Sequence, residues 1–193
     1  MKSRAMVSCL LAAMLVLPLG QAVAQDKKAD SKEAKRAEIQ KMSSDTLAQL
    51  YKASPGAKEK IEKAAGYGVF SNFGVTIVFV GGAGGKGLVH DNASKKDSYM
   101  NMGQAQAGLG VGAAKYRAVF IFKDAKTLQT FVDKGWEVGG QAGGVAKAGK
   151  TGGADTAGTS IHPGIEIYQL GENGAIIGVT VAGTKYWKDG DLN

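Results

Sequence analysis

Cysteine is nearly absent from this chain, with Cys9 alone among 193 residues. Because a disulfide needs two cysteines, none can form within the chain, and stability must come from a hydrophobic core. Cys9 lies inside an apolar run with only eight residues before it, so almost no hydrophobic segment precedes a lipid-attachment site. We therefore set lipoprotein modification aside.

Histidine is also scarce, with His90 and His162 as the two examples. Neither belongs to a spaced cluster with cysteines or carboxylates, so the sequence predicts no metal site. A Gly-x-Ser-x-Gly nucleophile elbow is missing as well. We predict no catalytic residues, no cofactor and no enzymatic activity, with a hydrolase assembled from distant segments as an alternative.

No apolar run reaches the roughly 20 residues that a membrane-spanning helix needs. The longest runs from Met6 to Leu19, follows Lys2 and Arg4, and precedes the small-x-small sequence Ala22-Val23-Ala24. This pattern is typical of a cleavable signal peptide over residues 1–24, with cleavage before Gln25. It predicts a periplasmic or secreted protein, peripheral to a membrane, and a retained N-terminal anchor is the alternative.

The charge is moderately basic, with 24 Lys and Arg against 17 Asp and Glu, a formal charge of +7. Removal of Lys2 and Arg4 with the signal peptide lowers this charge by two. Nucleic acid is not a natural partner outside the cytoplasm. The basic excess therefore favours anionic lipid surfaces or acidic polymers.

The segment 25–65 has the charged, alanine-rich composition of helices. Its first part, the arm 25–36, lacks a large apolar residue, which favours a frayed helix or a disordered arm. A helix is predicted from Arg36 to Ala53, because its apolar residues recur on one face. Pro55 ends it, and a second helix is predicted over 57–65.

Glycine becomes frequent after Gly66, and the hydrophobic period changes toward two. One helix is predicted within this region, over 124–134, with Asp124 as N-cap and Gly135 as its end. The predicted strands are 68–70, 75–80, 87–90, 103–113, 116–122, 165–170 and 175–185. We therefore predict an α+β fold, a single domain over 37–193. A helical N-terminal segment precedes a glycine-rich antiparallel β body, either a curved sheet or a small barrel, with one inserted helix.

The run Gly82-Ala83-Gly84-Gly85-Lys86-Gly87 matches a dinucleotide-binding fingerprint literally. That motif must open a helix, whereas Leu88-Val89-His90 continues here as a strand. We interpret the run as a hairpin turn with a solvated Lys86. A turn with free backbone amides beside a lysine can also meet a lipid phosphate.

Candidate lipid-binding residues gather near the mature N-terminus. A basic group could attract headgroups, and an apolar helix face could enter the bilayer surface. A solvated helix stabilised by pairs of opposite charge is the alternative for the basic group. The candidates are Lys27, Lys28, Lys32, Lys35, Arg36, Ile39, Met42, Leu50 and Lys86.

A series of short motifs occurs in a distinctive order: 47–51, 55–58, 64–70, the glycine run 81–87, 108–112, Gly135-Trp136-Glu137-Val138-Gly139, and 183–185. Over about residues 37–187 the chain resembles the SYLF lipid-binding domain family, in its exported bacterial branch. The resemblance implies binding to phospholipid membranes, partly through an N-terminal amphipathic helix. Members usually carry a lysine before the glycine run; residues 74–79 have none, which leaves Lys86 as the nearest basic candidate.

Two functions follow from these observations. The first is an exported, non-catalytic lipid-binding domain that associates with anionic phospholipid headgroups at membrane surfaces. The alternative is a structural or protein-interaction domain of the cell envelope, whose N-terminal helix packs on its own β body and whose partner is an unidentified envelope protein.

Overall fold

The structure is a computed structural model, and it describes the backbone of residues 19–138, 159–177 and 184–193. Three helices lie in these ranges: α1 (Leu19–Ala53), α2 (Gly56–Lys63) and α3 (Ala125–Lys134). Among the described residues, none of the helices has the length and apolar character that crossing a membrane requires. The strands are β1 (Gly66–Asp91), β2 (Asp97–Phe122), β3 (Trp136–Val138), β4 (Thr159–His162), β5 (Ile165–Gly171), β6 (Ile176–Ile177) and β7 (Thr184–Lys188).

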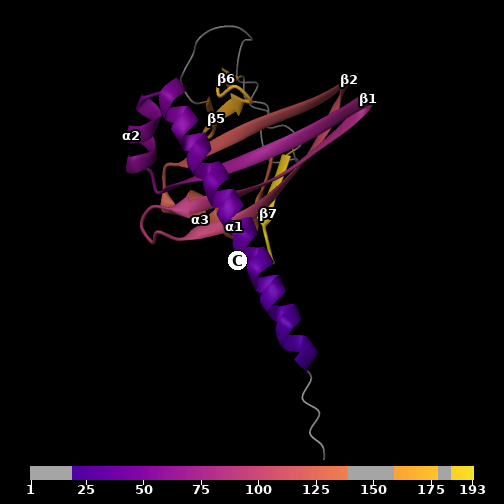
Figure 1. Ribbon diagram of the computed structural model, residues 1–193. Helices are drawn as coiled ribbons and strands as arrows, with labels where there is room; N and C mark the ends of the chain where they lie inside the picture. Colours follow the sequence, from indigo (N-terminus) through magenta and orange to yellow (C-terminus); the bar gives the residue numbers. More distant parts are fainter. Residues whose placement is uncertain (1–18, 139–158, 178–183) are drawn as a thin grey trace, which may run out of the picture.

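The described strands form one antiparallel sheet in the order β3-β7-β2-β5-β4, with β1 beside β2 and β6 beside β5. Strands β1 and β2 are 26 residues each and make a long hairpin that bends in its middle (Figure 1). The two ends of β2 pair with different strands, β7 near Met102 and β5 near Phe120. The sheet does not close on itself, so the predicted α+β fold is confirmed and the curved sheet replaces the small barrel.

Glycines allow the two halves of β1 to lie against each other. A Cβ atom at Gly87 would overlap the backbone carbonyl oxygen of Val69, and one at Gly85 would overlap that of Ser71. A side chain at either position would push the two halves apart. The glycine run is therefore part of a strand, and the predicted hairpin turn at 82–87 is wrong because the turn lies at 92–96.

Other element boundaries also differ from the predictions. The charged arm 25–36 is helical and belongs to α1, which begins at Leu19. The strands predicted at 68–70, 75–80 and 87–90 are parts of β1, and those at 103–113 and 116–122 are parts of β2. The predicted strands merge because the backbone groups of β1 and β2 pair along nearly the whole hairpin, whatever the side chains are.

Helix α3 matches its prediction closely. The Asp124 side chain accepts a hydrogen bond from the Thr127 amide at 2.8 Å, and Gly135 ends the helix with a φ of 70°. Its buried residues Leu128, Phe131 and Val132 face the sheet. Of the strand predicted at 175–185, residues 178–183 lie outside the described part of the chain, as do residues 1–18 of the predicted signal peptide.

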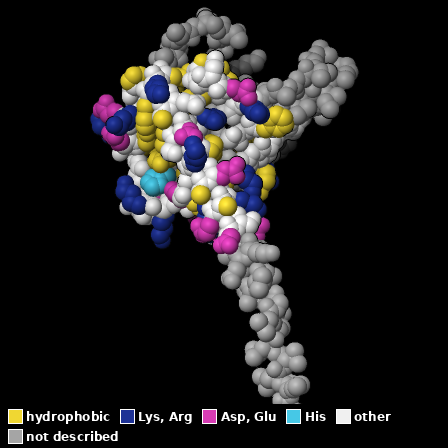
Figure 2. Space-filling view, viewed as in Figure 1, with side chains coloured by type: hydrophobic (Ala, Val, Ile, Leu, Met, Phe, Trp, Pro, Cys, Tyr) yellow, Lys and Arg dark blue, Asp and Glu magenta, His cyan; other side chains and the backbone are white. Residues whose placement is uncertain are grey.

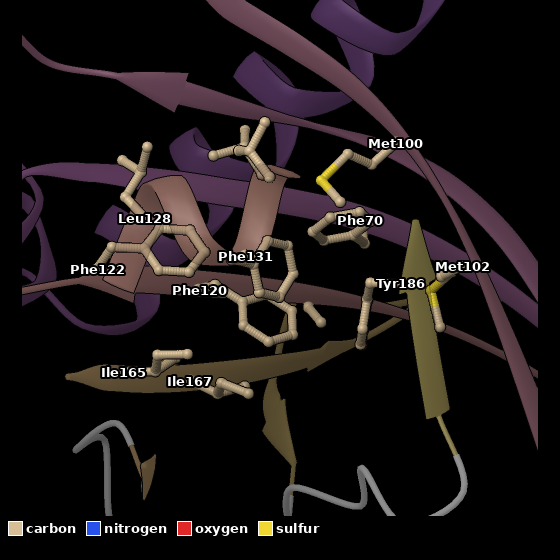
Figure 3. Close-up of a cluster of buried hydrophobic side chains, with 13 residues drawn as sticks. Phe70, Met100, Met102, Phe120, Phe122, Leu128, Phe131, Ile165, Ile167 and Tyr186 are labelled. Carbon is tan, nitrogen blue, oxygen red and sulfur yellow. The ribbon is translucent and has the colours of Figure 1, made fainter. Parts of the chain in front are cut away.

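An aromatic cluster fills the inner side of the curved sheet (Figure 3). Phe120 lies at its centre, with ring centroids 5.2 Å from Tyr186, 5.5 Å from Phe70 and 5.6 Å from Phe131. The cluster draws its residues from β1, β2, β5, β7 and α3. This shared core fixes how the long hairpin bends around α3.

Helices α1 and α2 cover the outer side of the sheet. One group of buried residues joins them to β1, β2 and β5, with Leu50 and Ile61 from the helices and Val119 and Tyr168 from the strands. Figure 1 shows α1 crossing the sheet and continuing past the β body, with the chain's last residue beside it.

Candidate functional site

All but one of the candidate residues lie on α1. Lys27 and Lys28 are within the helix, in a stretch whose side chains are not described. Lys35 is exposed, and Lys32 and Arg36 are half-buried. The basic residues therefore lie in the N-terminal half of α1, on both sides of the point where the helix reaches the body.

The apolar candidates face the protein's own sheet. Ile39 is 6 % exposed and Leu50 is fully buried, while Met42 is half-buried between the two outer clusters. Ser43 and Thr46, which lie between Ile39 and Leu50 on the same side of α1, are buried as well. In this conformation the apolar face of α1 contacts the β body and is covered.

Residues 189–193, which we call the clasp, form a compact structure beside α1. The buried Asp189 carboxylate accepts hydrogen bonds from the amides of Asp191 at 2.9 Å and Leu192 at 3.2 Å. The Asn193 side chain bonds both backbone polar groups of Tyr99, donating at 2.8 Å and accepting at 3.0 Å. The clasp is therefore fixed to the start of β2.

The clasp also holds α1. The Arg36 Nε atom donates to the Leu192 carbonyl oxygen at 2.9 Å, and the guanidinium lies 5.8 Å from the centre of the Tyr99 ring. Lys32 lies 4.0 Å from the Asp191 carboxylate. Leu192 itself is 2 % exposed and packs in a cluster with Ile39.

Lys86 reaches the same region from β1, with its Nζ atom 3.5 Å from the Asp189 carboxylate. Four candidates therefore meet at the clasp: Lys32, Arg36 and Ile39 from one face of α1, and Lys86 from a distant part of the sequence. Leu50 lies at the other end of the contact between α1 and the sheet, and the Lys35 side chain is exposed.

A second polar contact joins α1 to the long hairpin. Gln40 donates to the Asp97 carboxylate at 3.2 Å. The other oxygen of Asp97 lies 2.7 Å from His90 Nδ1, and the His90 ring stacks on Tyr67 with centroids 5.1 Å apart. The part of α1 from Lys32 to Gln40 thus contacts both the clasp and the end of the β1–β2 hairpin.

Lys86 lies on a paired strand opposite Asn101, and not in a hairpin turn. Lys86 is 51 % exposed, and Gly82 and Gly84 on the same strand are exposed. A Cβ at Gly84 would meet nothing within 4 Å. Trp187 of β7, 42 % exposed, covers Gly103 beside this surface.

Sequence reasoning missed the clasp. Its contacts are hydrogen bonds from one short turn to backbone groups far away in the chain, and such contacts leave no hydrophobic period. The one available signal was the Asp189-Gly190-Asp191 sequence, whose residue types favour turns. Among the described side chains, no three or more His, Cys, Asp or Glu come together as metal ligands would.

The Asp189 pKa predicts how the clasp responds to acid. Burial works to raise this pKa, but the amides of Asp191 and Leu192 and the Lys86 ammonium outweigh it and hold the pKa below its usual 3.8. Because its pKa is lowered in the folded state, the ionised Asp189 carboxylate stabilises the folded protein above pH 3.8. This stabilisation is lost as the pH falls through the lowered pKa. The clasp should therefore loosen only in strong acid.

We expect Asp189→Asn to lower the free energy of unfolding by about 1–2 kcal/mol at neutral pH, because an uncharged amide accepts these bonds less strongly. Urea denaturation at several pH values measures this loss, and the difference from wild type should shrink below pH 3.8. Asp191→Asn, at an 82 % exposed side chain, is the control and should change little. An equal loss in both variants at neutral pH would contradict this account of the clasp.

The comparisons with known proteins add one relative. The chain is 35 % identical over 162 residues to beta cell expansion factor A of Aeromonas veronii. The matched region covers 84 % of this chain and 60 % of that protein. The two proteins are homologous. The chain thus spans less than two thirds of its relative's length, and no protein-family model matches it.

Proposed function

We propose that this chain is a SYLF-type domain that is exported and binds anionic phospholipid surfaces without catalysing a reaction. The observation that carries the proposal is the position of the basic residues. The start of α1, with Lys27 and Lys28, extends past the β body (Figure 1), and Lys32 lies where the helix reaches the clasp. Lys86 lies at the same place, 3.5 Å from the Asp189 carboxylate.

The attraction to a membrane should be weak and sensitive to salt. A well-placed basic residue near an anionic surface contributes about 1 kcal/mol, and this falls off within a Debye length. Five basic residues of the arm 25–36 are interspersed with Asp26, Asp30 and Glu33. Figure 2 shows acidic and basic side chains mixed where α1 leaves the body, so the net charge there is small.

The exported part of the proposal rests on the sequence pattern of residues 1–24. For this chain we keep the predicted signal peptide over 1–24 and a periplasmic or secreted location at the periphery of a membrane.

Flotation with lipid vesicles tests the proposal. The protein is purified from the exported fraction, and its intact mass shows whether it begins at Gln25. We expect it to float with phosphatidylcholine vesicles that contain phosphatidylglycerol, to float much less with phosphatidylcholine alone, and to be released by salt. Equal flotation with both vesicles and no effect of salt would contradict the electrostatic part.

A second function is favoured by the burial of Ile39 and Leu50. If α1 stays on the sheet, the chain serves as a structural or protein-interaction domain of the cell envelope. Under this alternative the exported protein floats with neither kind of vesicle, since its apolar helix face is already occupied.

A further inference from the structure

The apolar face of α1 cannot contact the β body and a bilayer at the same time. Ile39 lies against Leu88, Tyr99 and Leu192, and Met42 packs on the same cluster. A bilayer offers apolar surroundings to the same side chains. Membrane binding through this face therefore requires that α1 leave the sheet, at least in part.

The polar side chains of α1 can likewise bond either the clasp or a membrane, but not both at once. Arg36 donates to the Leu192 carbonyl oxygen, and Lys32 lies near the Asp191 carboxylate. Phosphate oxygens are acceptors that suit both side chains at least as well. An anionic surface can thus replace each bond that the clasp makes to α1.

The stretch of α1 between Ile39 and Leu50 is the natural place for the helix to bend. The Ser44 hydroxyl bonds the carbonyl of Gln40 at 3.1 Å, and the Thr46 hydroxyl bonds that of Met42 at 2.7 Å. Hydroxyls that bond backward in this way weaken a helix and often bend it. Thr46 is buried, yet its hydrogen bond to Met42 stays within α1 and does not join the helix to the sheet.

The two ends of the docked helix are held differently. Leu50 is fully buried in a large cluster with residues of α2, β1, β2 and β5. Ile39 belongs to a cluster of four buried residues, one of which is Leu192 of the clasp. The contact of α1 with the body around Ile39 therefore depends on the clasp, whereas the contact around Leu50 does not.

We propose that the clasp, residues 189–193, holds the part of α1 before Ser44 against the β body, and that an anionic phospholipid surface releases it by replacing the contacts of Lys32, Arg36 and Ile39. The helix bends near Ser44 and Thr46 while Leu50 stays in place. This inference rests on the proposed function, and it makes Ile39 and Met42 the residues that enter the lipid.

A reversible cross-link tests the opening. Gln40→Cys and Asp97→Cys, whose wild-type side chains are 3.2 Å apart, are joined by a bismaleimide with a reducible spacer in a Cys9→Ser background. We expect the linked exported protein to bind phosphatidylglycerol vesicles about tenfold more weakly than the unlinked, alkylated form. Reducing the spacer should restore binding.

The matched control links two positions within α2, outside the helix that is proposed to move. Lys58→Cys and Glu62→Cys replace an exposed ion pair one turn apart, so their cross-link leaves α1 free to bend and to move from the sheet. This form should bind vesicles as the unlinked protein does. If the Gln40–Asp97 link leaves binding unchanged, the opening is overturned while the proposed function stands. If no form binds, both fall.

A substitution in the clasp gives a second test, in which vesicle affinity should rise and not fall. Leu192→Ala removes a buried contact to Ile39 and should favour the open helix, which raises vesicle affinity about threefold. The aromatic core around Phe120 is a separate cluster that shares no residue with this one, so its near-UV circular dichroism should be kept. Lower affinity with an intact near-UV spectrum would contradict the proposal.

Discussion

Gly87→Ala is expected to cost at least about 3 kcal/mol of unfolding free energy, or to prevent folding altogether. The new methyl group would overlap the backbone carbonyl oxygen of Val69 and the ring of Phe70. Backbone atoms in a paired strand cannot move aside as a flexible side chain can. The two halves of β1 would have to separate, and the bend of the long hairpin would be lost. Urea denaturation followed by circular dichroism measures the effect.

Gly84→Ala is the matched control for this prediction. It lies three residues away in the same strand, and a Cβ there meets nothing within 4 Å. Alanine also loses less conformational entropy than glycine on folding, so we expect a change within about 1 kcal/mol. Similar losses at both positions would show that the halves of β1 do not approach as described.

Phe120→Ala is expected to cost about 3–5 kcal/mol, the range for removing a buried phenylalanine side chain. The Phe120 ring is fully buried and contacts the rings of Phe70, Phe131, Trp136 and Tyr186. Because these residues come from four different elements, the cavity would loosen the packing of α3 against the sheet. The urea midpoint should fall, and the near-UV circular dichroism of the aromatic residues should weaken.

Phe73→Ala provides the comparison at an exposed phenylalanine. Phe73 is 49 % exposed, and its ring lies 5.7 Å from the Lys115 ammonium. Loss of this exposed contact should cost about 0.5–1 kcal/mol. If Phe73→Ala proved as damaging as Phe120→Ala, the aromatic cluster would not be the main core.

Helix α3 shows what the sequence could predict. Asp124 and Gly135 mark its ends by local chemistry, and the spacing of Leu128, Phe131 and Val132 marks its buried face. The apolar stripe of α1 was found in the same way. These predictions succeed because capping and helical periodicity depend on neighbours within a few residues.

The glycine run shows where such reasoning fails. Glycine often marks a turn, and the sequence does not reveal that Gly85 and Gly87 lie against another part of the same strand. That contact depends on the bend of the hairpin, which in turn depends on the core around Phe120. The clasp was missed for a related reason, because Arg36 and Leu192 meet only in the folded chain.

The site was predicted in its parts and not in its arrangement. Lys32, Arg36, Ile39 and Lys86 were named as separate candidates, and Asp189 and Leu192 bring them together. The helix face itself gave no sign of whether it packs on protein or lipid, since both are apolar surroundings.

The fraction of exported wild-type protein that floats with phosphatidylglycerol-containing vesicles at low salt tests the central claim most directly. Our account predicts that the fraction is high there, falls as salt is added, and is low with phosphatidylcholine alone. A protein that stays with the unbound fraction under all of these conditions, while correctly folded, would contradict it.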